Sequence, residues 1–202
     1  MSNKAARYIA LGSMLKYTMP NFFIPSYFLT KFPMYSKEFG LVFALINIFM
    51  GPLAAVSSGI LSDKYASKKS TNYMANPWII IAGNVVALPA LLISMTTNNF
   101  WLSVGLMSFK VLGFENWWPI NIAMIQNATE SRKFGTMLTA SQFFSGTTYA
   151  ICLTLFGYIS NLLDLTLNPN RLGKIIAVFG SISMIGSSLA YFKAGLEYKK
   201  QR

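Results

Sequence analysis

The chain has 202 residues with no histidine and one cysteine, and 53% of its residues are hydrophobic while only 11% are charged. Soluble globular proteins carry about 25% charged residues, so this composition excludes most soluble enzymes. The formal net charge of +11 would indicate a nucleic-acid partner in a polar chain, but here the bases are too sparse. Four stretches contain no charged residue: Phe39–Ser62, Ser70–Phe109, Phe134–Leu163 and Ile175–Phe192. Uncharged apolar stretches of about 18 residues or more are typical of membrane-spanning helices.

In chain order, these stretches and two further apolar blocks with internal charges predict six membrane-spanning helices. They cover Tyr8–Lys31, Phe39–Leu61, Pro77–Met95, Phe100–Gln126, Gly135–Leu163 and Ile175–Phe192. About 20 helical residues cross a hydrocarbon core of about 30 Å, so each block is long enough. The apolar runs are continuous rather than alternating, which argues against strands. We therefore expect residues 1–202 to form a single all-α domain embedded in a lipid bilayer.

The distribution of bases predicts the orientation of these six helices. Eleven bases fall on the side that holds both termini: Lys4, Arg7, Lys64, Lys68, Lys69, Arg132, Lys133, Lys193, Lys199, Lys200 and Arg202. Four fall on the other side: Lys31, Lys37, Arg171 and Lys174. Because cytoplasmic loops are enriched in Lys and Arg, both termini are predicted to be cytoplasmic.

The sequence lacks the residues that several common kinds of protein chemistry require. Without histidine there is no Ser-His-Asp triad and no histidine-ligated metal. Gly173-Lys174 is followed by Ile175 and lacks the upstream glycine of a phosphate-binding loop. The six acidic residues are scattered and offer no paired carboxylates for acid-base catalysis. We therefore expect neither enzymatic activity nor a metal or cofactor, and no nucleic-acid partner.

Three charged residues fall inside predicted helices: Lys16 in the first, and Lys110 and Glu115 in the fourth. A charge near the bilayer centre costs about 2.5–3.5 kcal/mol, so each needs a physical reason. Lys16 could instead extend its ammonium to the headgroups, and Lys110 and Glu115 could neutralise each other within the bundle. Five residues apart on one helix they point about 140° from each other, so each is expected to face a different neighbour.

Prolines accompany these charges, and a helical proline leaves the carbonyl four residues earlier without its N–H partner. By this rule Pro20 frees the carbonyl of Lys16, Pro25 that of Asn21, and Pro119 that of Glu115. Such backbone breaks are tolerated in membranes where they are buried in protein or line a wet cavity. The solute or coupling-ion path is therefore predicted to include Lys16, Asn21, Lys110, Glu115, Asn116 and Trp117. Trp117 and Trp118 could equally contact lipid at an interface.

The two charged helices match each other at a spacing of 94 residues. The matched pairs are Lys16 with Lys110, Asn21 with Glu115, Phe23 with Trp117, and Pro25 with Pro119. The first and fourth helices run in opposite directions, so the match predicts an inverted repeat of three helices plus three. Inverted repeats with interrupted helices in corresponding positions mark the binding site of many secondary transporters.

A stripe of small residues, Gly51, Ala55 and Gly59, recurs every four residues in the second predicted helix. In a bilayer such stripes allow helix backbones to approach closely. The stripe could pack within these six helices or against helices that this chain lacks.

The segment that begins at Gly59, the last residue of this stripe, and ends at Lys69 resembles a known sequence motif. Gly59, Asp63, Lys64 and Lys68 match the G-x-x-x-D-[RK]-x-G-[RK]-[RK] loop of the major facilitator superfamily, while Ala66 and Ser67 depart from it. Together with six helices and cytoplasmic termini, this segment resembles the more degenerate second copy of the loop. The resemblance implies a major-facilitator-like C-terminal half, in which these residues form a cytoplasmic gate that opens and closes during alternating access. A solvated turn that only fixes orientation is the simpler interpretation.

These observations predict a secondary transporter domain that moves a small solute, with a proton or ion as a possible coupling partner. Since complete members of the family have twelve helices, we expect the chain to be a fragment or to function with an N-terminal half or a second copy. The alternative is a non-transporting membrane scaffold, receptor or assembly subunit that keeps the fold.

Overall fold

The computed structural model describes residues 4–66 and 74–200. Within these ranges the chain forms eight α-helices and three short 3-10 helices and contains no strand, which confirms the all-α prediction. The α-helices are α1 (Lys4–Lys16), α2 (Phe23–Lys31), α3 (Ser36–Ala66), α4 (Ala75–Thr96), α5 (Phe100–Phe114), α6 (Trp117–Ala128), α7 (Phe134–Leu162) and α8 (Pro169–Lys200). The 3-10 helices are η1 (Pro33–Tyr35), η2 (Ser131–Lys133) and η3 (Leu165–Leu167).

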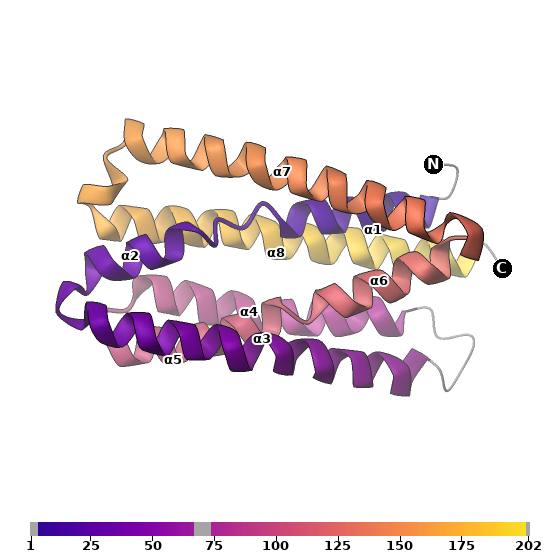
Figure 1. The fold of residues 1–202 in the computed structure, drawn as a ribbon, viewed down its shortest axis with the longest axis horizontal. Coiled ribbons are helices and arrows are strands. Elements are labelled where there is room, and N and C mark those ends of the chain that lie inside the picture. The colour runs from indigo at the N-terminus through magenta and orange to yellow at the C-terminus, as the bar shows by residue number, and fades with distance from the viewer. Residues whose placement is uncertain (1–3, 67–73, 201–202) are drawn as a thin grey trace.

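When α1 with α2 and α5 with α6 are each taken as one pass, the eight α-helices make six antiparallel passes along the long axis, and the N- and C-termini lie at the same end (Figure 1). The first pass consists of α1 followed by α2, and the fourth of α5 followed by α6. The structure therefore divides each of these two predicted spans into two helices, and the backbone breaks expected beside their prolines lie within them. The first pass is interrupted over residues 17–22, which include Pro20, and the fourth pass is interrupted at Glu115 and Asn116. Pro20 has no N–H to continue a helix, whereas Pro119 lies in the first turn of α6, where its N–H is not needed.

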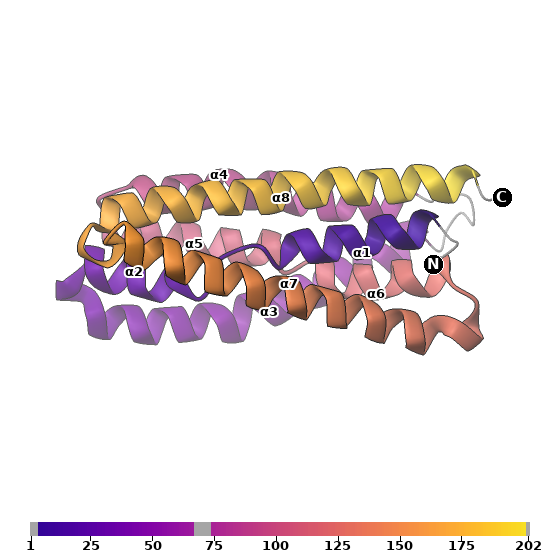
Figure 2. The same ribbon diagram turned by 90° about the horizontal axis from the view of Figure 1, so that it is seen from above.

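The passes are arranged in three layers, which Figure 2 shows from above. The helices α4 and α8 lie on one side, α3 and α7 on the other, and both interrupted passes lie between them. Met19 in the first break and Asn116 in the second are buried, whereas Phe22 in the first break is 68% exposed.

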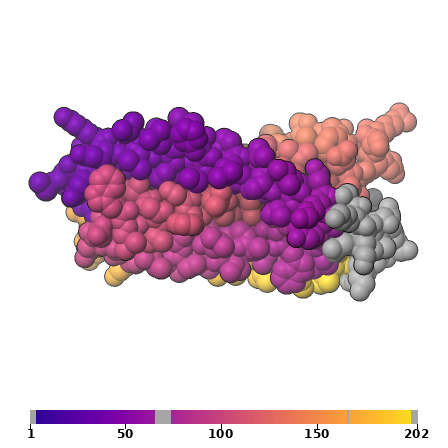
Figure 3. Space-filling view, turned by 90° about the horizontal axis from the view of Figure 1, so that it is seen from below, coloured from indigo at the N-terminus to yellow at the C-terminus, as the bar shows by residue number. Residues whose placement is uncertain are grey.

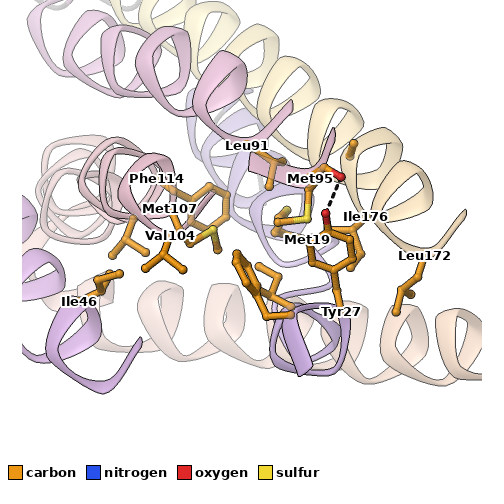
Figure 4. Close-up of a cluster of buried hydrophobic side chains, with 14 of the residues drawn as sticks. Met19, Tyr27, Ile46, Leu91, Met95, Val104, Met107, Phe114, Leu172 and Ile176 are labelled. Carbon is orange, nitrogen blue, oxygen red and sulfur yellow. Dashed lines mark hydrogen bonds between the residues drawn. The ribbon is translucent and has the colours of Figure 1, made fainter. Parts of the chain in front are cut away.

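Aromatic and methionine side chains fill the interior on both sides of the interrupted segments. Met19, Leu91 and Phe114, from three different passes, belong to one buried cluster (Figure 4). The hydroxyl of Tyr27 donates a hydrogen bond of 2.6 Å to the carbonyl of Met95, which connects α2 to α4. Ile46 on α3 belongs to the same cluster, so the core joins all three layers.

Large apolar side chains also cover the outside of the bundle. Leu41 and Phe49 on α3 are 66% and 62% exposed, and Val85 on α4 is 66% exposed. In the described part of the chain, four segments are long and apolar enough to cross a membrane: Pro33–Tyr65, Ala75–Thr96, Ser131–Leu162 and Pro169–Tyr198. An apolar exterior of this extent is suited to lipid rather than to water. These features are those of an α-helical membrane protein.

Candidate functional site

The breaks in the first and fourth passes meet in the interior through Lys16. Lys16 is the last residue of α1, and its side chain is only 2% exposed. Its ammonium donates a hydrogen bond of 3.2 Å to the carbonyl of Phe114, the last residue of α5. The end of one interrupted helix is thus bonded directly to the end of the other.

The remaining contacts of Lys16 extend to α4 and α8. Its ammonium donates a hydrogen bond of 2.6 Å to Asn84 Oδ1 and lies 4.1 Å from the centre of the Phe114 ring. Asn84 Nδ2 donates to the Met184 carbonyl at 3.1 Å and to Ser188 Oγ at 2.8 Å. The Lys16 ammonium therefore lies in the protein interior and does not extend to the membrane surface.

Lys110 makes the reciprocal connection from α5 to the break in the first pass. Its side chain is 3% exposed, and its ammonium donates a hydrogen bond of 2.8 Å to Asn21 Oδ1. The same ammonium lies 4.7 Å from the centre of the Phe114 ring. Both ammonium groups therefore lie near the same aromatic ring, that of Phe114, at distances that allow cation–π attraction. We call Lys16, Asn21, Asn84, Lys110, Phe114 and Glu115 the lysine cluster.

Glu115 supplies the only acidic group of this cluster. It directly follows α5, is half-buried, and interacts electrostatically with Lys16, Lys110 and Tyr17. Among the described residues no ion pair within 4.0 Å joins Glu115 to either lysine. The formal charge of the cluster is therefore +1, and its opposite charges are not neutralised by direct contact.

The Lys16 carbonyl, which Pro20 leaves without a helical N–H donor, accepts hydrogen bonds from other groups. The hydroxyl of Ser183 on α8 donates to the carbonyl of Lys16 at 3.2 Å and to that of Leu15 at 2.8 Å. The N–H of Met19 also bonds the Lys16 carbonyl, at 3.4 Å. An unpaired carbonyl in an apolar interior costs several kcal/mol, so these bonds explain how the break is tolerated.

Two residues of the predicted path lie outside this cluster. Asn116 points to α4, where its Nδ2 donates a hydrogen bond of 3.0 Å to the Ile79 carbonyl. Trp117 is 5% exposed and packs edge-on against Tyr17, with ring centres 5.7 Å apart. Trp118 is 39% exposed, so the two adjacent tryptophans differ in their surroundings. The structure brings together Lys16, Asn21, Lys110 and Glu115, and it places Asn116 and Trp117 on other sides of the fourth pass.

The residues of the predicted gate lie near one end of the bundle. Gly59, Asp63 and Lys64 belong to α3, which continues to Ala66, five residues beyond the predicted end. Asp63 and Lys64 are in its last turn, and the Lys64 ammonium lies 5.8 Å from the centre of the Tyr65 ring. Lys68 lies outside the described residues.

The small-residue stripe on α3 has no close helix against its glycines. A Cβ added at Gly51 or at Gly59 would meet no atom within 4 Å, and Ala55 is half-buried. Close backbone contact occurs instead between α4 and α5, where Gly83 and Gly113 face each other.

Sequence reasoning missed Asn84, Phe114 and Ser183. Asn84 interrupts the otherwise apolar stretch Pro77–Met95, so its polarity was a usable signal. Phe114 and Ser183 carry no comparable signal, because aromatic and serine residues are common in membrane helices. Within residues 4–66 and 74–200, no group of three His, Cys, Asp or Glu side chains could hold a metal ion.

No protein-family model matches this sequence, and no curated protein matches it. Fold and site therefore define the class: an α-helical membrane protein with two interrupted passes and a buried basic cluster between them.

Proposed function

We propose that this chain is a six-pass unit of a secondary transporter, of the major facilitator type, that moves a small solute by alternating access. The observation that carries the proposal is the reciprocal bonding of the two breaks, from Lys16 to Phe114 and from Lys110 to Asn21. Interrupted membrane helices that meet around polar groups are typical of transporter binding sites. The lysine cluster is the proposed site for the solute or its coupling ion.

The spacing in sequence between α2 and α6, the second helices of the two interrupted passes, supports an inverted repeat. The helix α2 begins at Phe23 and α6 at Trp117, which matches the sequence spacing of 94 residues. Pro25 and Pro119 are each the third residue of their helix. In Figure 1 the two passes run in opposite directions along the bundle. The first helices correspond less well, since α1 ends at Lys16 whereas α5 continues four residues beyond Lys110.

The low burial of α3 and α7 supports the proposal that this unit packs against a second six-pass unit. That unit would be supplied by the same polypeptide or by a second copy. Only 17% of the most apolar part of α3 and of α7 is buried, against 44% for α4 and α8. On α7 the side-chain oxygens of Ser141 and Ser145 and the Nε2 of Gln142 are buried without a hydrogen-bond partner. Polar groups at membrane depth are stable against protein or water but not against lipid. Ser141 and Ser145 are 2% and 0% exposed, so these groups face the interior of this unit, and the low burial of α3 and α7 is what supports a partner.

The charge of the lysine cluster favours an anionic solute. Two bases and one acid at this depth leave one positive charge to be balanced, and a carboxylate or phosphate group would balance it. Transfer of a proton at the same groups is the coupling that this arrangement could support. Asp63 and Lys64, in the last turn of α3, would then belong to the gate at this end of the bundle.

A non-transporting scaffold is the second candidate, and one observation favours it. Two donors of Lys16 have hydrogen-bond acceptors and its charge contacts an aromatic ring, so this residue acts as a structural connection between three helices. Lys110 has one acceptor. The test of transport therefore uses Lys110.

The test is uptake by liposomes that contain the full chain, with radiolabelled dicarboxylates, phosphate, amino acids and sugars as candidate solutes. We expect uptake of at least one anion, a loss of at least about ten-fold in Lys110→Met, and a smaller loss in Glu115→Gln. Lys174→Met is the matched control, because Lys174 is exposed on α8 and outside the cluster. Uptake in Lys110→Met that equals uptake in Lys174→Met would remove the cluster from the path. A folded chain that moves none of these solutes would favour the scaffold.

A further inference from the structure

One aromatic residue of α7, Tyr149, contacts both ends of the break in the first pass. The centre of its ring lies 6.1 Å from that of Tyr17, the first residue after α1. It lies 6.4 Å from that of Phe22, the last residue before α2. Ring centres about 4.5–7 Å apart are typical of favourable aromatic pairs. A single side chain of α7 therefore packs against the beginning and the end of residues 17–22.

The same ring is part of a row that reaches the break in the fourth pass. Beyond Tyr149 the row continues through Tyr17 to Trp117, the first residue after that break, with ring centres 5.7 Å apart. Further along α7, the ring of Phe156 lies 4.3 Å from that of Phe23, the first residue of α2. The position of α7 is thus linked by aromatic rings to both interrupted passes.

The break that Tyr149 contacts carries the acceptor of Lys110. Asn21 lies in this break, and its Oδ1 accepts the hydrogen bond of 2.8 Å from the Lys110 ammonium. On the other side, Ser183 of α8 bonds the carbonyl of Lys16, which precedes the break. The start of the break is therefore fixed to α8 by hydrogen bonds, whereas the two ends of the irregular segment around Asn21 pack against α7.

The helix α7 is also less firmly held than the helices on the opposite side of the bundle. Only 17% of its most apolar part is buried, against 44% for α4 and α8. Figure 3 shows the region of η2 and the start of α7, in salmon, at the same edge of the molecule as α3, in purple. Displacing a helix in a membrane costs the packing contacts that it loses, so α7 is easier to displace than α4 or α8.

We propose that Tyr149 is a positioning residue that couples α7 to Lys110. While its ring packs against both ends of the break, Asn21 is held where it accepts from Lys110. Movement of α7 away from the first pass removes this support and frees the Lys110 ammonium. The inference rests on the transport function proposed above, in which α7 moves against the second unit during alternating access.

The test is reductive methylation of the full chain in phosphatidylcholine nanodiscs with formaldehyde and dimethylamine–borane, followed by mass spectrometry. The measured quantity is the ratio of the methylation rates of Lys110 and Lys16, which are 3% and 2% exposed. Each rate reports how often the hydrogen bonds of that amine open. In Tyr149→Ala we expect the ratio to rise by at least about three-fold, as the loss of one aromatic contact provides. Lys16 should keep its rate, because its acceptors belong to α4 and α5.

Three further variants separate positioning from a general loosening of the fold. Tyr149→Phe keeps the ring and should leave the ratio unchanged, as should Tyr158→Ala, at a residue of α7 that is 66% exposed. Phe22→Ala removes one contact from the side of the break, at a side chain that is 68% exposed, and should raise the ratio. This variant decides the test if Tyr149→Ala does not fold. An equal rise for both lysines, or a ratio no higher than in Tyr158→Ala, would overturn the proposal.

Methylation is measured without any solute, so this inference and the proposed transport can fail separately. A raised ratio in a chain that takes up none of the candidate solutes would retain the coupling of α7 to Lys110 and reject transport. An unchanged ratio in a chain that takes up an anion would retain transport and reject the role of Tyr149.

Discussion

The contact between Gly83 on α4 and Gly113 on α5 gives a sharp prediction about stability. A Cβ added at Gly113 would lie 2.4 Å from the Gly83 carbonyl oxygen, and one added at Gly83 would lie 2.4 Å from that of Gly113. Ordinary van der Waals contact begins at 3.4 Å, so the two helices would have to separate by about 1 Å. At Gly113 the nearest atom belongs to the backbone, so no side-chain rotation relieves the contact, whereas at Gly83 the Asn116 amide would lie closer still, at 1.9 Å.

The expected cost follows from comparing Gly113→Ala with Gly105→Ala on the same helix. A Cβ at Gly105 would meet no atom within 4 Å. Alanine improves helix propensity by up to about 1 kcal/mol at either position, so this gain cancels in the comparison. Overpacking costs about 1–3 kcal/mol. We therefore expect Gly113→Ala to be less stable than Gly105→Ala by about 1–3 kcal/mol.

Thermal unfolding in detergent, followed by fluorescence of the four tryptophans, measures this difference. For a chain of this length 1 kcal/mol corresponds to about 2–4 °C, so a Tm difference of about 2–12 °C is expected. The double variant with Gly83→Ala should lose less than the two single losses added, because the first substitution already separates the helices. Equal Tm values for Gly113→Ala and Gly105→Ala would refute the close contact between α4 and α5.

Two further substitutions test the polar connections of the interior. Asn84→Leu removes an acceptor of the Lys16 ammonium and should lower the free energy of unfolding by about 3 kcal/mol. The double variant with Lys16→Met should recover part of this loss. A double-mutant cycle of unfolding free energies measures the difference. Additive losses in that cycle would contradict the hydrogen bond between these side chains. Tyr27→Phe removes the hydrogen bond to the Met95 carbonyl, together with the one that the partly exposed Lys31 ammonium donates to the same hydroxyl, and should cost about 0.6–2 kcal/mol in the same unfolding assay. Tyr158→Phe, at a residue that is 66% exposed, is the control and should cost nothing measurable, and a Tyr27→Phe loss no greater than this control would argue against that bond.

The length of the apolar stretches determined which helix ends could be predicted from the sequence. The stretch Pro77–Met95 falls within α4, and Gly135–Leu163 covers α7 to within one residue at each end. The last stretch, Ile175–Phe192, is much shorter than α8. Hydropathy marks the part of a helix that lipid can surround, and it gives no information on how far polar residues continue the helix beyond it.

Pro20 indicated the interruption of the first pass but not which groups compensate for it, and a proline alone does not locate a break, since Pro52 and Pro89 lie inside continuous helices. Pro20 indicated a free carbonyl at Lys16, and the structure pairs that carbonyl with Ser183, which is 167 residues away. Asn84 is 68 residues from Lys16. Such partners depend on which faces of α4 and α8 meet the first pass, and local sequence patterns do not contain that information.

The two buried lysines differ in a way that bears on their roles. An ammonium has three donors; Lys16 uses two of them on Asn84 and Phe114, whereas Lys110 uses one on Asn21. Both acceptors of Lys16 belong to regular helices, while Asn21 lies in the irregular turn between α1 and α2. Movement of that turn would separate Lys110 from its acceptor and leave its charge available to an anion, whereas Lys16 would remain paired. For the transport function proposed above, Lys110 is therefore the charge that a conformational change in the first pass would release from its structural bond.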